Sequence, residues 1–153
     1  NFAQATIADI YGEQMLNASL HYKATTFAHH WIENKGNGVL IMRPLPDRAQ
    51  LSSINAIACI HEKVNDTEFI VAGNLYGSEA ETPRNDASIG LLLCSNARGE
   101  IRVVPPAESG FVVKGEVKAI GKIKLASGKE GFLFGINNDS LKLIELDVNP
   151  LSR

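Results

Sequence analysis

The chain lacks the features that mark membrane-spanning, nucleic-acid-binding and most catalytic proteins. None of its apolar runs approaches the roughly 18–20 residues that a transmembrane helix needs. Its 15 basic and 17 acidic residues leave a net charge of −2, so its charge favours neither nucleic acid nor an anionic membrane as a partner. It contains no G-x-S-x-G elbow and no glycine-rich phosphate loop. We therefore find no catalytic motif, and a binding role is favoured over catalysis.

Cysteine is scarce as well, with only Cys59 and Cys94 in 153 residues. Both lie in strand-like segments, and we expect buried thiols rather than a disulfide, because cysteine is among the most frequently buried residues. The redox compartment stays open on this basis. An initiating Met and a signal peptide are also missing, and we interpret the chain as an excised or processed piece of a longer protein.

Helical periodicity is confined to residues 5–20. Its apolar positions are Ile7, Ile10, Tyr11, Met15 and Leu20. Gly12 interrupts the pattern, since glycine costs about 1 kcal/mol relative to alanine inside a helix. We expect a short helix, broken near Gly12, in an N-terminal attachment of residues 1–22 that packs against residues 23–153.

The rest of the chain alternates short apolar runs with turn residues, which is typical of an all-β protein. The expected strands are 25–33, 39–43, 54–60, 69–72, 89–94, 101–104, 117–125, 131–135 and 141–146. Their turns centre near Gly36, Asn65, Arg98 and Gly128, a spacing of roughly 30 residues that indicates a repeat. Residues 69–72 and 89–94 are apolar throughout, as in strands buried on both faces.

We therefore predict an all-β fold with a short N-terminal α-helix. The expected architecture is a partial β-propeller made of antiparallel four-stranded blades. Residues 23–153 would hold about two blades plus a partial blade, because two hairpins make one blade. A compact β-sandwich is the alternative, since it would give similar runs and turn spacing.

Six segments carry a resemblance to a known family. They are residues 26–28, 31–38, 42–46, 72–77, 84–90 and 105–115. In their order and spacing the chain resembles the terminal blades of FG-GAP/VCBS-repeat proteins, which are mostly exported bacterial β-propellers related to the integrin α-chain repeat. The resemblance covers about residues 20–146. It implies an extracellular, periplasmic or outer-membrane-surface location and further blades of a parent protein as partners.

The calcium loop of that family departs from its pattern here. The family has a D-x-D-x-D-G type run, and calcium needs six to eight oxygen ligands. The equivalent residues 61–68 place Lys63 and Val64 where oxygen ligands and a small turn residue would be needed. The other candidate loop, residues 122–129, has no acidic residue. We expect a degenerate loop, with no metal and no cofactor.

Histidine and serine residues offer weak catalytic or metal-binding candidates. His29 and His30 would point to opposite faces of a strand, so they cannot chelate one ion together. Ser88 follows Asp86, but nothing fixes a base beside its hydroxyl. We expect the Asp86 side chain to bond backbone N–H groups two residues on instead. Trp31 could stack on a carbohydrate, although a half-buried structural position is the favoured interpretation.

The polar loop of residues 77–85 is the best candidate for a binding site, because binding residues concentrate in loops on a rigid scaffold. Our candidate ligand-binding residues are Trp31, Arg84 and Asp86, with no catalytic residue. The predicted function is a non-enzymatic binding or interaction module for a protein or glycan. The alternatives are a hydrolase with a site around Asp86, Arg84 and His61, or a structural segment that closes a ring. The last alternative predicts self-association of this piece through exposed apolar faces.

Overall fold

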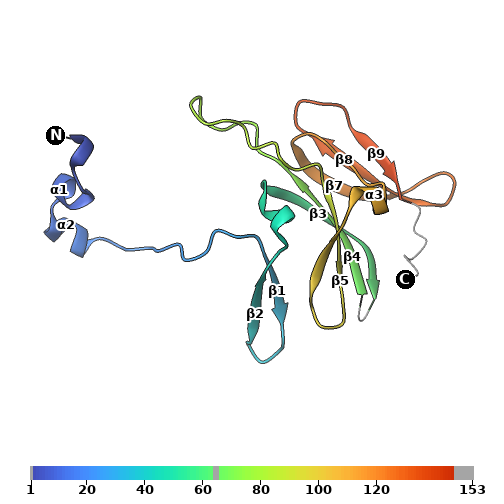
Figure 1. Cartoon of the computed structure of the whole chain (residues 1–153), viewed down its shortest axis with the longest axis horizontal. Coiled ribbons are helices and arrows are strands. Elements are labelled where there is room, and N and C mark those ends of the chain that lie inside the picture. Colours follow the sequence, from blue (N-terminus) through green and yellow to red (C-terminus); the bar gives the residue numbers. More distant parts are fainter. Residues whose placement is uncertain (1, 64–65, 147–153) are drawn as a thin grey trace.

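The computed structural model describes residues 2–63 and 66–146. Three antiparallel sheets follow one another along the chain (Figure 1). The first sheet pairs β1 (His30–Asn34) with β2 (Leu40–Pro44). The second, central sheet contains, in this order, β3 (Ile54–Lys63), β4 (Asp66–Gly73), β5 (Leu91–Ser95) and β6 (Ile101–Val104). The third contains β7 (Val117–Lys124), β8 (Glu130–Ile136) and β9 (Lys142–Glu145). The prediction of a mainly β chain with antiparallel sheets and few helices is confirmed, and every expected strand overlaps an observed one.

The central sheet carries the core on both of its faces. On one face, Ile70 and Leu92 pack with Phe132 and Phe134 of β8. On the other, Leu93 belongs to a second cluster, which includes the residues Leu45, Ala49, Phe69, Val71 and Leu91. Ile70 and Leu93 are both fully buried. Strands β4 and β5 are therefore covered on two sides, as their uninterrupted apolar sequence predicted.

Two prolines shorten the first hairpin. The strand expected over residues 25–33 begins only at His30, whose partner in the sheet is Pro44. Leu45 and Pro46 follow Pro44, and a proline has no backbone N–H with which to extend the ladder. A short 3₁₀ helix, η2 (Asp47–Gln50), then leads the chain into β3. Of the predicted turn centres, Asn65 lies outside the described residues.

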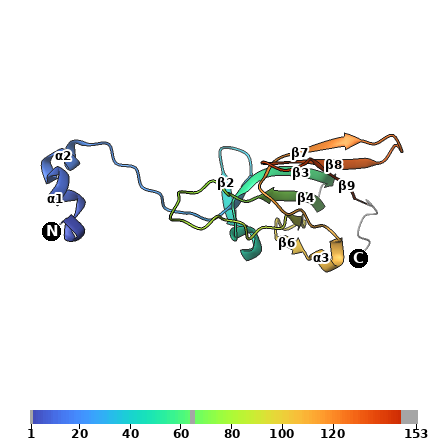
Figure 2. The same ribbon diagram turned by 90° about the horizontal axis from the view of Figure 1, so that it is seen from above.

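The N-terminal residues form an arm that stands away from the sheets (Figures 1 and 2). It contains η1 (Phe2–Gln4), α1 (Ile7–Tyr11) and α2 (Glu13–Ala18). The predicted break is present, because Gly12 has a φ of 79° between the two helices. Neither helix has a buried residue, so the expectation that this segment packs against the body is wrong. The break interrupts the apolar stripe that one continuous helix would have presented.

Two further details differ from expectation. A short helix, α3 (Pro106–Ser109), begins at a proline and ends where Gly110 adopts a φ of 67°, a common pairing of helix boundaries. Cys94 is buried, as predicted, whereas Cys59 is exposed, so the expected burial of Cys59 was wrong. Cys59 lies beside a register shift in the pairing of β3 with β4. Within residues 2–63 and 66–146, no helix has the length and apolar character needed to cross a bilayer.

Candidate functional site

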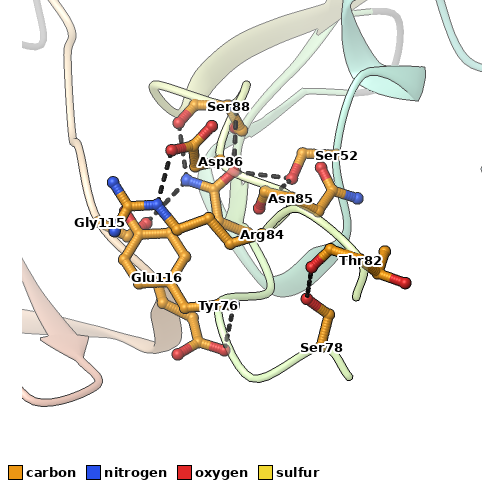
Figure 3. A network of polar contacts seen from close by, with 11 residues as sticks. Ser52, Tyr76, Ser78, Thr82, Arg84, Asn85, Asp86, Ser88, Gly115 and Glu116 are labelled. Atoms are coloured by element: carbon orange, nitrogen blue, oxygen red, sulfur yellow. Dashed lines mark hydrogen bonds and ion pairs between the residues drawn. The ribbon is translucent and has the colours of Figure 1, made fainter. Parts of the chain in front are cut away.

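A polar cluster lies where β4 ends and the chain enters the long connection to β5 (Figure 3). At its centre is Asn74, the residue after the last residue of β4. Its side chain is only 1% exposed and its φ is 86°, a conformation that asparagine tolerates better than most residues. A buried amide of this kind has to find partners for both its oxygen and its nitrogen.

The amide of Asn74 joins three separate segments. Its Oδ1 accepts hydrogen bonds from Ser52 Oγ at 2.7 Å and from the Ser88 backbone N–H at 3.0 Å. Its Nδ2 donates to the Ser88 carbonyl at 2.8 Å and to the Gly115 carbonyl at 2.9 Å. The Asn74 carbonyl also accepts a bond from Asn55 Nδ2 at 2.8 Å. The side chain therefore uses all its hydrogen-bonding groups to fix both ends of the connection.

Glu116 makes a second buried polar contact next to the first. The residue is 2% exposed, and its Oε1 accepts bonds from Lys118 Nζ at 2.7 Å and from the Tyr76 backbone N–H at 3.2 Å. Its Oε2 accepts from Asn137 Nδ2 at 2.7 Å. The hydrogen bonds from Lys118 and Asn137 lower the pKa of Glu116 to about 2 against the opposing effect of burial. This carboxylate joins the start of the loop to the β8–β9 turn.

The loop of residues 77–85 leaves the body as a narrow excursion closed by a β-bridge between Leu75 and Asn85. Arg84 lies with its guanidinium 4.7 Å from the centroid of the Tyr76 ring, within the range of a cation–π contact. The same guanidinium forms an ion pair with Asp86, with 2.9 Å between Nε and Oδ2 (Figure 3). Arg84 therefore joins Tyr76 to Asp86 at the two ends of this loop.

A cavity of about 410 Å³ opens beside Tyr76. The residues that line it are Tyr76, Lys114, Gly115, Ile136, Asn137, Asn138, Asp139 and Lys142. They come from three segments: the start of the loop, the residues before β7, and the end of β8 with the β8–β9 turn and β9. Asn74 and Glu116 hold these segments together, and the cavity volume lies within the range of small-molecule sites.

The three candidate residues separate in the structure. Arg84 and Asp86 lie together at the root of the loop, whereas Trp31 stacks on Phe69 at 5.5 Å between ring centroids. Trp31 is half-buried and packs against the second core cluster, in line with the favoured structural interpretation. It is not among the residues that line the cavity.

Asp86 does not form the backbone contact that the sequence predicted. The Ser88 N–H bonds to Asn74 Oδ1, while Asp86 pairs with Arg84. The reason is that Asn74, although distant in sequence, already occupies the Ser88 backbone. His61 lies inside β3 opposite Glu68, and no histidine of the described segments is hydrogen-bonded to Asp86.

The sequence analysis did not identify Asn74, Glu116 or the β8–β9 turn as parts of a candidate site. Asn74 could have been noticed as an asparagine directly after an apolar strand, a position that suits a positive φ. Glu116 gave no comparable signal, because a single carboxylate at the start of a strand is ordinarily exposed. Its partners are up to 40 residues away in the chain.

Comparison of the chain with protein-family models, with curated proteins and with solved structures finds no match. Among the described residues, no group of three or more His, Cys, Asp or Glu side chains is arranged to hold a metal ion. The polar cluster and the cavity beside Tyr76 form the candidate site.

Replacing Asn74 by glycine tests the importance of its hydrogen bonds without adding backbone strain. Asn74→Gly should lower the free energy of unfolding by about 2–3 kcal/mol, because buried polar groups of Ser88, Gly115 and Ser52 lose their partner. Urea denaturation measures this change. Asn138→Gly is the matched control, since Asn138 also has a positive φ, 56°, but is exposed, and it should change stability by less than about 0.5 kcal/mol. Equal effects of the two substitutions would contradict the assigned role of Asn74.

Glu116 should make the stability of the protein depend on pH in acid. Its folded-state pKa of about 2 lies below the ordinary value of 4.5, so its stabilising effect is complete above about pH 4.5 and is lost as the pH falls towards 2. Glu116→Gln should therefore flatten the decline in unfolding free energy between these pH values. Glu81→Gln, at an exposed position in the loop, should leave the decline unchanged. Parallel curves for Glu116→Gln and wild type would rule out this linkage.

Proposed function

We propose that this chain is a non-enzymatic binding module whose ligand enters the cavity beside Tyr76. The observation that carries the proposal is the construction of this cavity from three distant segments fixed by Asn74 and Glu116. Preorganised groups of this kind reduce the conformational entropy that binding would otherwise cost. The adjoining loop of residues 77–85 is exposed over most of its length and can add contacts to a protein or glycan.

We infer that the module belongs to a larger β-propeller of the FG-GAP/VCBS type, exported or held at a cell surface. The central sheet supports this architecture, because its four strands are antiparallel and neighbours in sequence are neighbours in the sheet. The third sheet also packs on one face of the central sheet through the first core cluster, and Trp31 of the first hairpin packs on the other face through the second. Asn55 Nδ2 donates to the Val117 carbonyl at 3.0 Å, so the first strand of the central sheet lies beside the first strand of the next.

The pairing of Asp86 supports binding over hydrolysis. A hydrolase around Asp86 would need a base or nucleophile within hydrogen-bonding reach of it. Asp86 instead neutralises Arg84, whose side chain also covers the Tyr76 ring. These three residues form a structural support for the cavity wall.

Removing the Tyr76 side chain tests the binding proposal. Labelled wild-type protein should bind a subset of spots on glycan or peptide arrays, and Tyr76→Ala should reduce that binding by about tenfold or more through loss of the aromatic wall. Tyr22→Ala removes an equally large side chain from the exposed arm and should bind as wild type does. Binding that survives Tyr76→Ala in full would place the ligand elsewhere.

Exposed apolar residues on the outermost sheets favour a second role, as a segment that joins neighbouring sheets. Ile32, Leu40 and Met42 are each more than half exposed, and the register of β1 with β2 places them on one face. Trp31 and Arg43 lie on the opposite face, towards the core. On β9, Leu143 is 52% exposed. Apolar faces of this kind are typical of sheets that another sheet covers.

The second role predicts that this chain associates with itself when no other sheet is present. Sedimentation velocity over a micromolar concentration series should show association of the wild type, and Met42→Glu should weaken it by placing a charge on the apolar face. Val112→Glu introduces the same charge at another exposed position and should associate as wild type does. A wild type that is monomeric throughout the series would contradict this prediction.

A further inference from the structure

The cavity beside Tyr76 has an excess of positive charge, although the whole chain has a net charge of −2. Its lining contains two lysines, Lys114 and Lys142, and one carboxylate, Asp139. Lys142 is partly compensated, because its Nζ donates to the Lys114 carbonyl at 3.2 Å and lies 3.8 Å from Asp139 Oδ2. The side-chain ammonium of Lys114 has no hydrogen bond or ion pair with any described residue, although the backbone carbonyl of Lys114 accepts the bond from Lys142. One cation of the cavity is thus free to pair with a ligand.

The other charged groups around the cavity are already paired. Glu116 beneath it pairs with Lys118, and Arg84 beside Tyr76 pairs with Asp86. These pairs add no net charge to the cavity, so the positive charge of its lining favours an anionic ligand. The single uncompensated ammonium of Lys114 matches the single charge of a carboxylate, whereas the second charge of a phosphate group would have no free cation of the lining to pair with.

The uncharged groups of the lining favour a ligand rich in hydroxyl groups. The Asn138 amide and the Tyr76 hydroxyl have no partner among residues 2–63 and 66–146, whereas the Asn137 amide is used by Glu116. Both groups can donate and accept hydrogen bonds, as a hydroxyl-rich ligand requires. The Tyr76 ring and Ile136 supply apolar surface on the same cavity. A sugar ring presents apolar C–H surface and polar hydroxyls together, which matches this combination.

We propose that the cavity binds a sugar that carries a carboxylate, such as a uronic acid unit of a polysaccharide. This inference rests on the proposed binding function and narrows its ligand class. The carboxylate pairs with Lys114, the hydroxyls meet Asn138 and the Tyr76 hydroxyl, and the ring lies against Tyr76 and Ile136. Charge on Lys114 then decides between acidic and neutral sugars.

Galacturonate and galactose are the probes, because they differ only in the group at C6. Isothermal titration of the full chain should give at least about tenfold tighter binding of galacturonate, corresponding to about 1.4 kcal/mol. Lys114→Gln should remove this preference and leave the affinity for galactose unchanged. Lys124→Gln, which removes the same charge at an exposed position at the end of β7, should preserve the preference. Added salt should weaken galacturonate binding selectively.

The possible failures separate this inference from the proposed function. Equal affinity for the two sugars, or a preference that survives Lys114→Gln, overturns the acidic-sugar inference and leaves a sugar-binding module. Binding of a peptide with a free C-terminal carboxylate, with no binding of either sugar, overturns the inference and keeps a binding module with a protein ligand. Absence of galacturonate binding overturns the inference outright, while the array experiment with Tyr76→Ala decides the proposed function independently.

Discussion

The buried amide of Asn74 is the interaction on which the arrangement of this molecule most depends. It bonds to Ser52, Ser88 and Gly115, and so fixes the entry to β3, the end of the long connection and the approach to β7. All its donors and acceptors are satisfied, which makes a buried polar group specify one geometry instead of destabilising the core. Together with Glu116, this group holds in place the segments that line the cavity.

Burial on both faces of the central sheet explains why other segments of the chain pack on each of them. Strands β4 and β5 have no face that could remain in water, so one face packs on β7–β9 and the other on β1, η2 and their neighbours. The outer sheets also carry apolar side chains on a second face, but there Met42 and Leu143 are exposed. Apolar sequence at the ends of the stack is therefore consistent with the proposal that further sheets belong to the complete protein.

The sequence predicted those parts of the fold that depend on local residue order. The strand runs, the hairpin turns and the break at Gly12 could all be found in this way, because turn residues and apolar alternation act over a few positions. The pairing of Arg84 with Asp86 was not predicted, although the two candidates lie only two residues apart. Asn74 and Glu116 were missed because, apart from Lys118, their side-chain partners lie 14 to 41 residues away, and no local pattern encodes such contacts.

The separation of the N-terminal arm from the sheets has a consequence for how the molecule could engage two partners. Between α2 and β1 the chain is extended and exposed, and an extended chain spans roughly 3.3–3.6 Å per residue. A partner bound by exposed apolar side chains of the arm, such as Ile7 or Met15, would be tethered at a limited distance from the cavity. Such a tether raises the effective concentration of one partner near the other, so that two weak binding sites together give strong binding.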